Sequence, residues 1–265
     1  MQDDRDSGRR LTLFGAGPPK SGTHSIEGIF KQHYRAAHEP RRPRFIELIL
    51  AHEYGWIGRD TRRAMFLDLV RRMDLEVVAS HHMVHFVDLI RDHLRHAKVV
   101  LTIRNCYAWL DSIFNHELNR VTGLRLSSLR DLRYGRGRFV HAPEERLLSD
   151  HGLYTLDGYL SYWRWHIEHV IREMPRERLL VVRTRDLQTR IEEIAAFSGV
   201  PAATLSEDRS HEYKARRKHH VLERLDRHFL EAKVARHAGE LMARFFPDVA
   251  SLEDAGLGPG LRLAS

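Results

Sequence analysis

The segment from Leu11 to Phe30, LTLFGAGPPKSGTHSIEGIF, constrains the fold of this chain more than any other part of it. Strand-forming residues come first, a loop of glycine and proline with one lysine follows, and an amphipathic helix comes next. A strand, a tight glycine loop and a helix N-terminus together form a cradle whose backbone N–H groups point at an anion. The segment therefore predicts a phosphate-binding site within an α/β fold.

The position of the lysine distinguishes this loop from an ordinary ATP-binding loop. The Walker A pattern is G-x-x-x-x-G-K-[ST], in which the lysine follows the second glycine. Gly17 and Gly22 have this spacing, but Thr23 stands where the lysine should be, and the lysine of the loop is Lys20. We expect phosphate binding without the activity of a standard ATPase. A plain turn between strand and helix is the alternative.

A second candidate site lies in the segment AKVVLTIRNCYAWLDSIFNH, residues 97–116. Its β-branched run, residues 99–103, is typical of a buried parallel strand. The run ends in Arg104, and Ser112 follows eight positions later on a predicted helix. An arginine at the carboxyl end of such a strand is well placed to bind a phosphate. The alternatives are an ion pair of Arg104 with Asp111 or Glu117 and an ordinary helical serine.

The two segments together resemble the sulfotransferases. Residues 19–24, P-K-S-G-T-H, are similar to the P-K-S-G-T-T loop of that family, and Arg104 and Ser112 have the spacing of its arginine and serine. The resemblance implies that the donor is 3′-phosphoadenosine 5′-phosphosulfate (PAPS), that Arg104 and Ser112 bind its 3′-phosphate, and that no metal is needed. It further implies that loop amides bind the 5′-phosphate while Lys20 neutralises the bridging oxygen; the loop residues are Lys20, Ser21, Gly22, Thr23, His24 and Ser25.

The segment EVVASHHM, residues 76–83, supplies the candidate base. Residues 77–79 are a predicted strand, and the resemblance aligns His81 with the family's catalytic histidine, although the family's flanking lysine and proline are absent. An imidazole with a pKa near 6.5 can accept a hydroxyl proton at neutral pH. The chain has 19 histidines, so His82 and His85 stay open as the base, and so does Glu27, because some branches of the family use a glutamate.

A basic cluster late in the chain is the last candidate element of the donor site. The run YKARRKHH, residues 213–220, resembles the R-K-G segment that covers the 3′-phosphate, which implies this role for Arg216, Arg217 and Lys218. A solvated basic face is the alternative. Because Ser25 stands where the family often has an adenine-stacking aromatic residue, we look for that contact in Tyr213 or in the segment 161–165.

The pattern along the chain predicts a single α/β domain over residues 1–265, with a core of about 11–246 and a frayed tail at 248–265. Strands at 11–15, 76–79, 99–103 and 179–183 alternate with helices, which is typical of a central parallel sheet flanked by helices, here P-loop-like. Residues 36–75 and 219–246 are predicted to be helical, and a long helix follows residue 156. The segment 120–152 lacks clear periodicity and is predicted to be a lid or acceptor loop, with surface disorder as the alternative.

Composition restricts the class of protein further. The net charge of +7 is spread over scattered basic pairs without a nucleic-acid-binding motif, so we expect no nucleic-acid partner. No carboxylate or thiol lies at a familiar metal-ligand spacing from the histidines at 81, 82 and 85, so we expect no metal site. No apolar run is long enough to span a membrane, no signal peptide is visible, and the single Cys106 fits a reducing compartment, so we expect a cytoplasmic protein. The excess of arginine over lysine hints at a bacterial source.

The function expected from these features is sulfuryl transfer from PAPS to a hydroxyl or amine. The acceptor would be a small molecule or a carbohydrate, with tailoring of natural products as the preferred context by family analogy. A nucleotide kinase and a catalytically inactive nucleotide-binding protein are the alternatives. A homodimer stays open.

Overall fold

The computed structural model describes residues 12–206 and 217–257, and its centre is a five-stranded parallel sheet. The spatial order is β2 (Ala36–His38), β3 (Val77–Ala79), β1 (Leu13–Gly15), β4 (Lys98–Ile103) and β5 (Leu179–Arg183). β1 pairs with both β3 and β4, so the strand that precedes the predicted phosphate loop is central in the sheet. This architecture confirms the predicted fold class.

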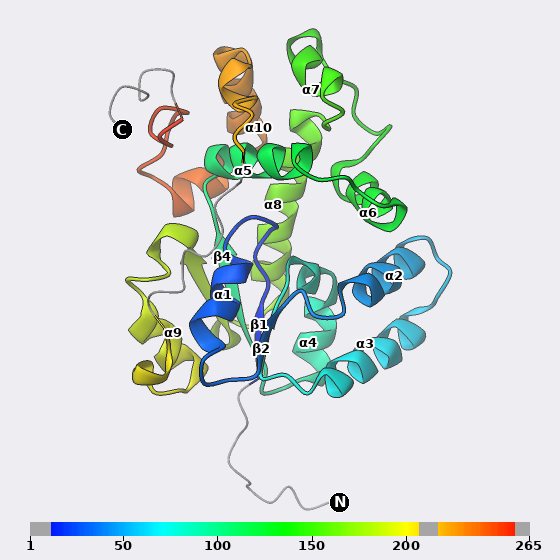
Figure 1. The fold of residues 1–265 in the computed structure, drawn as a ribbon, viewed down its shortest axis with the longest axis vertical. Helices are drawn as coiled ribbons and strands as arrows, with labels where there is room; N and C mark the ends of the chain where they lie inside the picture. The colour runs from blue at the N-terminus through cyan, green and yellow to red at the C-terminus, as the bar shows by residue number, and fades with distance from the viewer. Residues whose placement is uncertain (1–11, 207–216, 258–265) are drawn as a thin grey trace, which may run out of the picture.

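Helices cover both faces of the sheet (Figure 1). One face packs against α1 (Thr23–Phe30) and α9 (Ile191–Ser198). The larger helical layer on the other face consists of α2 (Arg42–Glu53), α3 (Arg59–Met73), α4 (Val87–His93), α5 (Cys106–Leu118), α6 (Leu124–Tyr134), α7 (Arg146–Asp150), α8 (Leu156–Glu173) and α10 (Arg227–Phe245). Successive residues of β1 alternate between the two layers, as strand geometry requires: Leu13 joins the first core and Phe14 the second. Among the described residues, no helix has the length and apolar character that crossing a bilayer requires.

Four of the five strands lie where the sequence predicts them, and β2 does not. Residues 36–75 were predicted to be helical, but Ala36–His38 pairs in parallel with β3, from Ala36 opposite Val77 to His38 opposite Ala79. This strand has only three residues, all half-buried, and its Ala-Ala-His sequence lacks β-branched residues. Pairing with β3 therefore determines this strand, and local propensity does not.

The segment 120–152 and the C-terminal helix also differ in detail from the prediction. Residues 120–152 contain α6 and α7, and α6 packs against α2 and α8 with Leu129 and Tyr134 buried. This segment is therefore not a long loop. The last helix begins at Arg227 instead of 219, because Asp226 caps it by accepting a hydrogen bond from the amide of Phe229 at 2.7 Å.

The loop that follows β1 lies directly against the end of β4. A Cβ atom added to Gly17 would overlap Thr102 Oγ1, the Thr102 carbonyl oxygen and Ser21 Oγ. Ser21 is fully buried. Its hydroxyl donates a hydrogen bond to Pro18 O at 2.6 Å, and the Thr102 carbonyl oxygen on β4 lies 2.9 Å from the same hydroxyl. Gly17 is thus required by close packing, because no side chain fits between the loop and the strand.

We predict that Gly17→Ala lowers the free energy of unfolding by about 1–3 kcal/mol, because the added methyl group must displace the loop from β4. Gly239→Ala is the matched control, since Gly239 lies within α10 and a Cβ there meets nothing within 4 Å. The control should gain about 0.5–1 kcal/mol from helix propensity. Urea unfolding of both variants measures the difference. Wild-type stability for Gly17→Ala would contradict the packing argument.

Candidate active site

The predicted phosphate loop has the geometry of an anion cradle. Gly22 caps α1 with a left-handed φ of 97°, and Lys20 also has a positive φ of 67°. The first hydrogen bond within the helix runs from the amide of Ile26 to the Gly22 carbonyl. The amides of residues 23–25 therefore belong to the first helical turn, whose N–H groups find no acceptor within the helix and attract anions. A positive φ in a lysine is strained and is typical of functional loops.

One cavity of about 680 Å³ lies at this loop, at the carboxyl ends of the strands. It brings together most of the predicted site residues: Lys20, Gly22, Thr23, His24, Ser25, His81, Arg104 and Ser112. These come from three separate segments of the sequence, which the parallel strands β1, β3 and β4 bring to one edge of the sheet. The spacing of Arg104 and Ser112 thus results in two side chains facing the same cavity.

The remaining predicted donor-site residues lie elsewhere. Ser21 does not line the cavity, and its amide donates to Pro18 O at 3.1 Å, so it braces the loop. Arg217 and Lys218 are exposed and do not line the cavity either, although the Arg217 carbonyl accepts a hydrogen bond from Asn119 Nδ2 at 2.9 Å, at the end of α5. Arg216 and Tyr213 lie outside the described residues.

The aromatic segment 161–165 does not reach the cavity lining. Trp163 is fully buried, and its indole N–H donates to the Arg104 carbonyl at 3.1 Å. Trp165 stacks on His169 with their ring centroids 5.2 Å apart. Trp163 ties α8 to the end of β4, whereas the stack of Trp165 on His169 lies within α8. The positions of these side chains do not support the prediction of an adenine contact from this segment.

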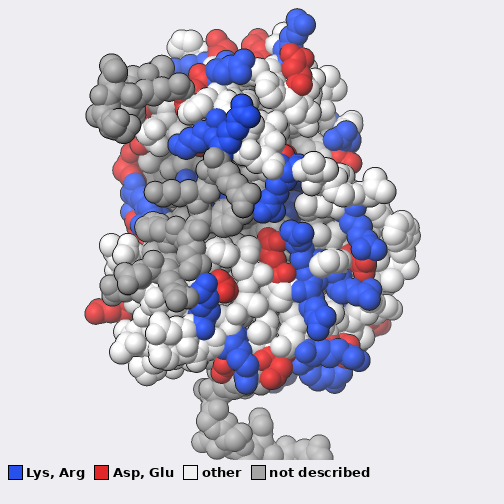
Figure 2. Space-filling model, viewed as in Figure 1, with Lys and Arg blue, Asp and Glu red and all other residues white. Residues whose placement is uncertain are grey.

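The cavity is strongly cationic. Seven of its lining residues are Lys or Arg, namely Lys20, Arg42, Arg104, Arg120, Arg130, Arg133 and Arg185, against the two carboxylates of Glu39 and Glu117. Figure 2 shows Lys and Arg side chains gathered over the middle and right of this face of the molecule. Burial lowers the pKa of Lys20, and the nearby Arg104 and Arg120 lower it further. Burial likewise lowers the pKa of Arg104. A polyanionic ligand would relieve this repulsion.

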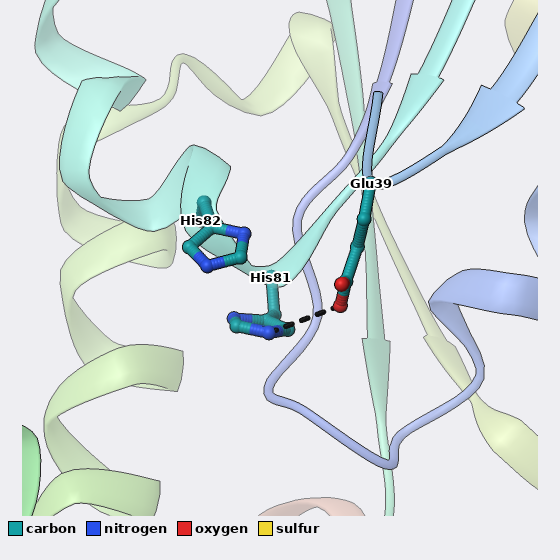
Figure 3. Close-up of side chains that lie close together, drawn as sticks. All are labelled: Glu39, His81 and His82. Carbon is teal, nitrogen blue, oxygen red and sulfur yellow. Dashed lines mark ion pairs between the residues drawn. The ribbon is translucent and has the colours of Figure 1, made fainter. Parts of the chain in front are cut away.

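His81 is held between the carboxylate of Glu39, which Figure 3 shows, and the guanidinium of Arg133. Its Nε2 atom lies 3.1 Å from Glu39 Oε1, and Arg133 Nη2 donates to its Nδ1 atom at 2.9 Å. Because Arg133 can only donate, Nδ1 accepts, and His81 is a neutral imidazole with its proton on Nε2. Burial and Arg133 lower the pKa of His81, while Glu39 opposes them. Burial raises the pKa of Glu39, but His81, His38 and Arg42 outweigh it and hold that pKa well below its usual range.

The alternative bases from the sequence do not line this cavity. His82 is fully buried, with its Nδ1 atom 3.0 Å from Ser80 Oγ, and burial lowers the pKa of both His82 and His85 far below normal. Glu27 pairs with Lys31 across one helical turn, at 3.7 Å. Of the four candidates, only His81 faces the phosphate loop across the cavity.

Sequence reasoning missed Glu39 because it missed β2. Glu39 follows directly after this short strand, at the same sheet edge as the phosphate loop, with a positive φ of 49°. A recognised strand at residues 36–38 would have marked Glu39 as a strand-end residue. The arginines of α6 were missed because that segment was read as a loop, although Arg130 and Arg133 are three residues apart and share one helix face.

Glu39, His81 and His82 also form a group whose potential metal-ligand atoms lie within 4.8 Å of one another. The sequence has no carboxylate at a familiar metal-ligand spacing from these histidines, and the fold supplies one. Arg133 donates to His81, however, and Arg42 lies 3.5 Å from Glu39. A metal ion here would lie beside two guanidinium groups, so we interpret the group as a hydrogen-bonded acid–base cluster.

Comparison with known proteins places the chain in a family. The family model described as a sulfotransferase domain matches residues 12–206, which is most of the chain, and the protein therefore belongs to the sulfotransferase domain family. Its general chemistry is sulfuryl transfer. No curated protein sequence matches the chain.

Solved sulfotransferase structures resemble the fold at low identity. One from Alicyclobacillus acidocaldarius is 20% identical, covers 89% of this chain and 96% of its own, and has a TM-score of 0.48. The sulfotransferase domain of the curacin biosynthetic pathway is 12% identical over 89% of this chain and 98% of its own, with a TM-score of 0.42. The sulfotransferase domain of the Synechococcus PCC 7002 olefin synthase is also 12% identical, over 97% of this chain and 96% of its own, with a TM-score of 0.36.

We predict that acid weakens this fold through His38, which lines the cavity beside Glu39. Burial lowers the pKa of His38 to about 4. Between about pH 6.5 and 4 the unfolded chain therefore binds a proton that the folded chain does not, and stability falls as the pH falls through that window. His38→Gln should make the free energy of unfolding less dependent on pH there, measured by urea unfolding at several pH values. The exposed His33→Gln is the control, and an equal effect of the two changes would contradict the assignment.

Proposed function

We propose that this protein transfers a sulfuryl group from PAPS to a hydroxyl or amine of a small-molecule or carbohydrate acceptor. One observation carries the proposal. A single cationic cavity combines the N-terminus of α1 and Lys20 with Arg104, Ser112 and a neutral histidine. The first four features suit a donor with two separate phosphate groups, and the histidine suits the removal of an acceptor proton.

The donor half of the cavity fits PAPS on charge and position. We assign the 5′-phosphate to the amides of residues 22–25 and the 3′-phosphate to Arg104, directly after β4, and Ser112 on α5, which line the same cavity. When bound, PAPS supplies an activated sulfuryl group on its 5′-phosphate. Lys20 neutralises the charge that develops on the bridging oxygen as the phosphate leaves. No step in this scheme requires a metal ion.

The acceptor half supplies the base. His81 Nδ1 takes the proton from the acceptor hydroxyl or amine as its oxygen or nitrogen bonds to sulfur. Glu39, which accepts a hydrogen bond from the Nε2 side of the ring, stabilises the imidazolium that forms. Depressed pKa values keep Glu39 ionised and His81 neutral before the reaction. The positive φ of Glu39 is one of the strained positions that place this pair.

Titration calorimetry with 3′,5′-adenosine bisphosphate (PAP), beside ATP, each with and without magnesium, tests the donor assignment. We expect PAP to bind without magnesium and Arg104→Ala to weaken it by about 1.5–3 kcal/mol, or roughly 10- to 150-fold. Arg176→Ala is the control, because Arg176 is exposed and precedes β5, at the amino ends of the strands and therefore away from the cavity. A preference for ATP with magnesium would favour a nucleotide kinase instead.

Turnover tests the reaction itself. Lys20→Ala should lower the release of PAP from PAPS in the presence of phenol, sugar and amine acceptors by about 10²-fold or more, because it removes transition-state charge stabilisation. His81→Ala should nearly abolish it. Lys31→Ala, at the C-terminal cap of α1, is the control, since Lys31 pairs with Glu27 outside the cavity.

Three results would revise these assignments. Near-normal turnover of Lys20→Ala would contradict its role at the bridging oxygen. An active His81→Ala beside an inactive Glu27→Ala would move the base to Glu27. If the wild type binds PAP but shows no turnover, and His81→Ala behaves in the same way, the protein binds the nucleotide without catalysis.

A further inference from the structure

Arg133 is a half-buried cation of the cavity that has no role in the proposed donor site. It lies on α6 and lines the cavity. Its Nη2 atom donates to His81 Nδ1 at 2.9 Å, and its Cζ atom lies 5.4 Å from the centroid of the Tyr162 ring. Both partners are neutral. Its Nε atom is buried and has no hydrogen-bond partner among the described residues.

The neighbouring arginines differ from Arg133 in having carboxylate partners. Arg42 lies 3.5 Å from Glu39, and Arg130 Nε lies 3.4 Å from Glu117 Oε1. Glu117 also accepts a hydrogen bond from Tyr159 at 2.7 Å, so its carboxylate is used by other groups. Within the described part of the chain, no carboxylate lies within ion-pair distance of Arg133. A half-buried guanidinium with a buried, unpartnered Nε atom and no carboxylate at ion-pair distance is unfavourable, and an anionic ligand group would offset that cost.

Arg133 belongs to the acceptor side of His81. The cations that act most on Lys20 of the donor loop are Arg104 and Arg120. Arg133 instead lowers the pKa values of His81, His82 and His85, and it also lowers the pKa of Glu117. His81 contacts Glu39 through one ring nitrogen and Arg133 through the other, so the imidazole stands between the two.

We propose that the acceptor carries an anionic group, a carboxylate or a phosphomonoester, close to the hydroxyl or amine that is sulfated, and that Arg133 binds this group. This inference rests on the proposed function. Binding draws Arg133 from His81 Nδ1 to the anion and so exposes the nitrogen that takes the acceptor proton. Until an acidic acceptor binds, the hydrogen bond from Arg133 keeps His81 Nδ1 from accepting a proton. Arg133 is therefore a specificity-determining residue.

Matched probe pairs test this inference by calorimetry on the full chain, with and without saturating PAP. The pairs are 4-hydroxyphenylacetate with its methyl ester, and glycerol 3-phosphate with glycerol. We expect the wild type to bind the acid of at least one pair roughly tenfold or more tightly than its neutral partner, as a charge-assisted contact implies. The pair that shows this preference identifies the anion as carboxylate or phosphate.

Variants assign the preference to Arg133. Arg133→Gln should bind acid and neutral partner alike, and Arg133→Lys should retain part of the difference. Arg125→Gln, on the exposed side of the same helix and paired with Glu47 at 3.1 Å, should keep the wild-type preference. In the wild type, binding of the acid should also raise the pKa of His81, followed by NMR of its Cε1 proton, and this rise should be absent in Arg133→Gln.

The outcomes separate this inference from the function it rests on. Equal binding of acid and neutral partner to the wild type in both pairs overturns it, and so does a preference that survives in Arg133→Gln. If Arg133→Gln weakens PAP and leaves the acid preference intact, Arg133 serves the donor and the inference is wrong. If the wild type does not bind PAP, the proposed donor fails, whatever the result with the acids.

Discussion

Three carbonyl groups of the loop after β1 are held by side chains from three distant parts of the chain, and the site depends on this clamp. His166 Nε2 lies 2.7 Å from Ala16 O, Trp109 Nε1 donates to Pro19 O at 2.7 Å, and Thr184 Oγ1 donates to Ser21 O at 2.6 Å. These donors belong to α8, α5 and the turn after β5. Together they hold the strained backbone at Lys20 and Gly22 open towards the cavity.

The positive charge that faces this cavity is offset by the burial of apolar side chains elsewhere in the fold. Folding buries Lys20 and Arg104 together, which lowers both of their pKa values and is unfavourable without an anion. Burial of the aromatic and aliphatic side chains behind the cavity, among them Trp109, Phe114 and Trp163, offsets that cost. Because the cations repel one another in the empty site, binding of an anionic ligand should raise the free energy of unfolding. Removing one of these cations should stabilise the unliganded protein while it weakens ligand binding.

The acid–base side of the cavity depends on contacts between short elements. β2 has only three residues, yet it places His38 in the cavity lining and Glu39 against His81. α6 brings Arg133 to the other ring nitrogen of the same histidine. Both ring nitrogens of His81 are therefore fixed by residues far from it in sequence, and its tautomer is set by tertiary contacts.

The sequence by itself determined the parts of this protein that local pattern encodes. The glycine loop with Lys20, the β-branched strand that ends in Arg104, and Ser112 eight residues later were sufficient to predict a parallel α/β fold and its family, because strand and helix periodicity and loop glycines are local properties. Only the tertiary structure decided which charged groups meet. Glu39 follows a strand without strand propensity, and Arg133 lies in a segment that reads as a loop. Their partnership with His81 results from strand pairing and helix packing across long stretches of sequence, which no local pattern contains.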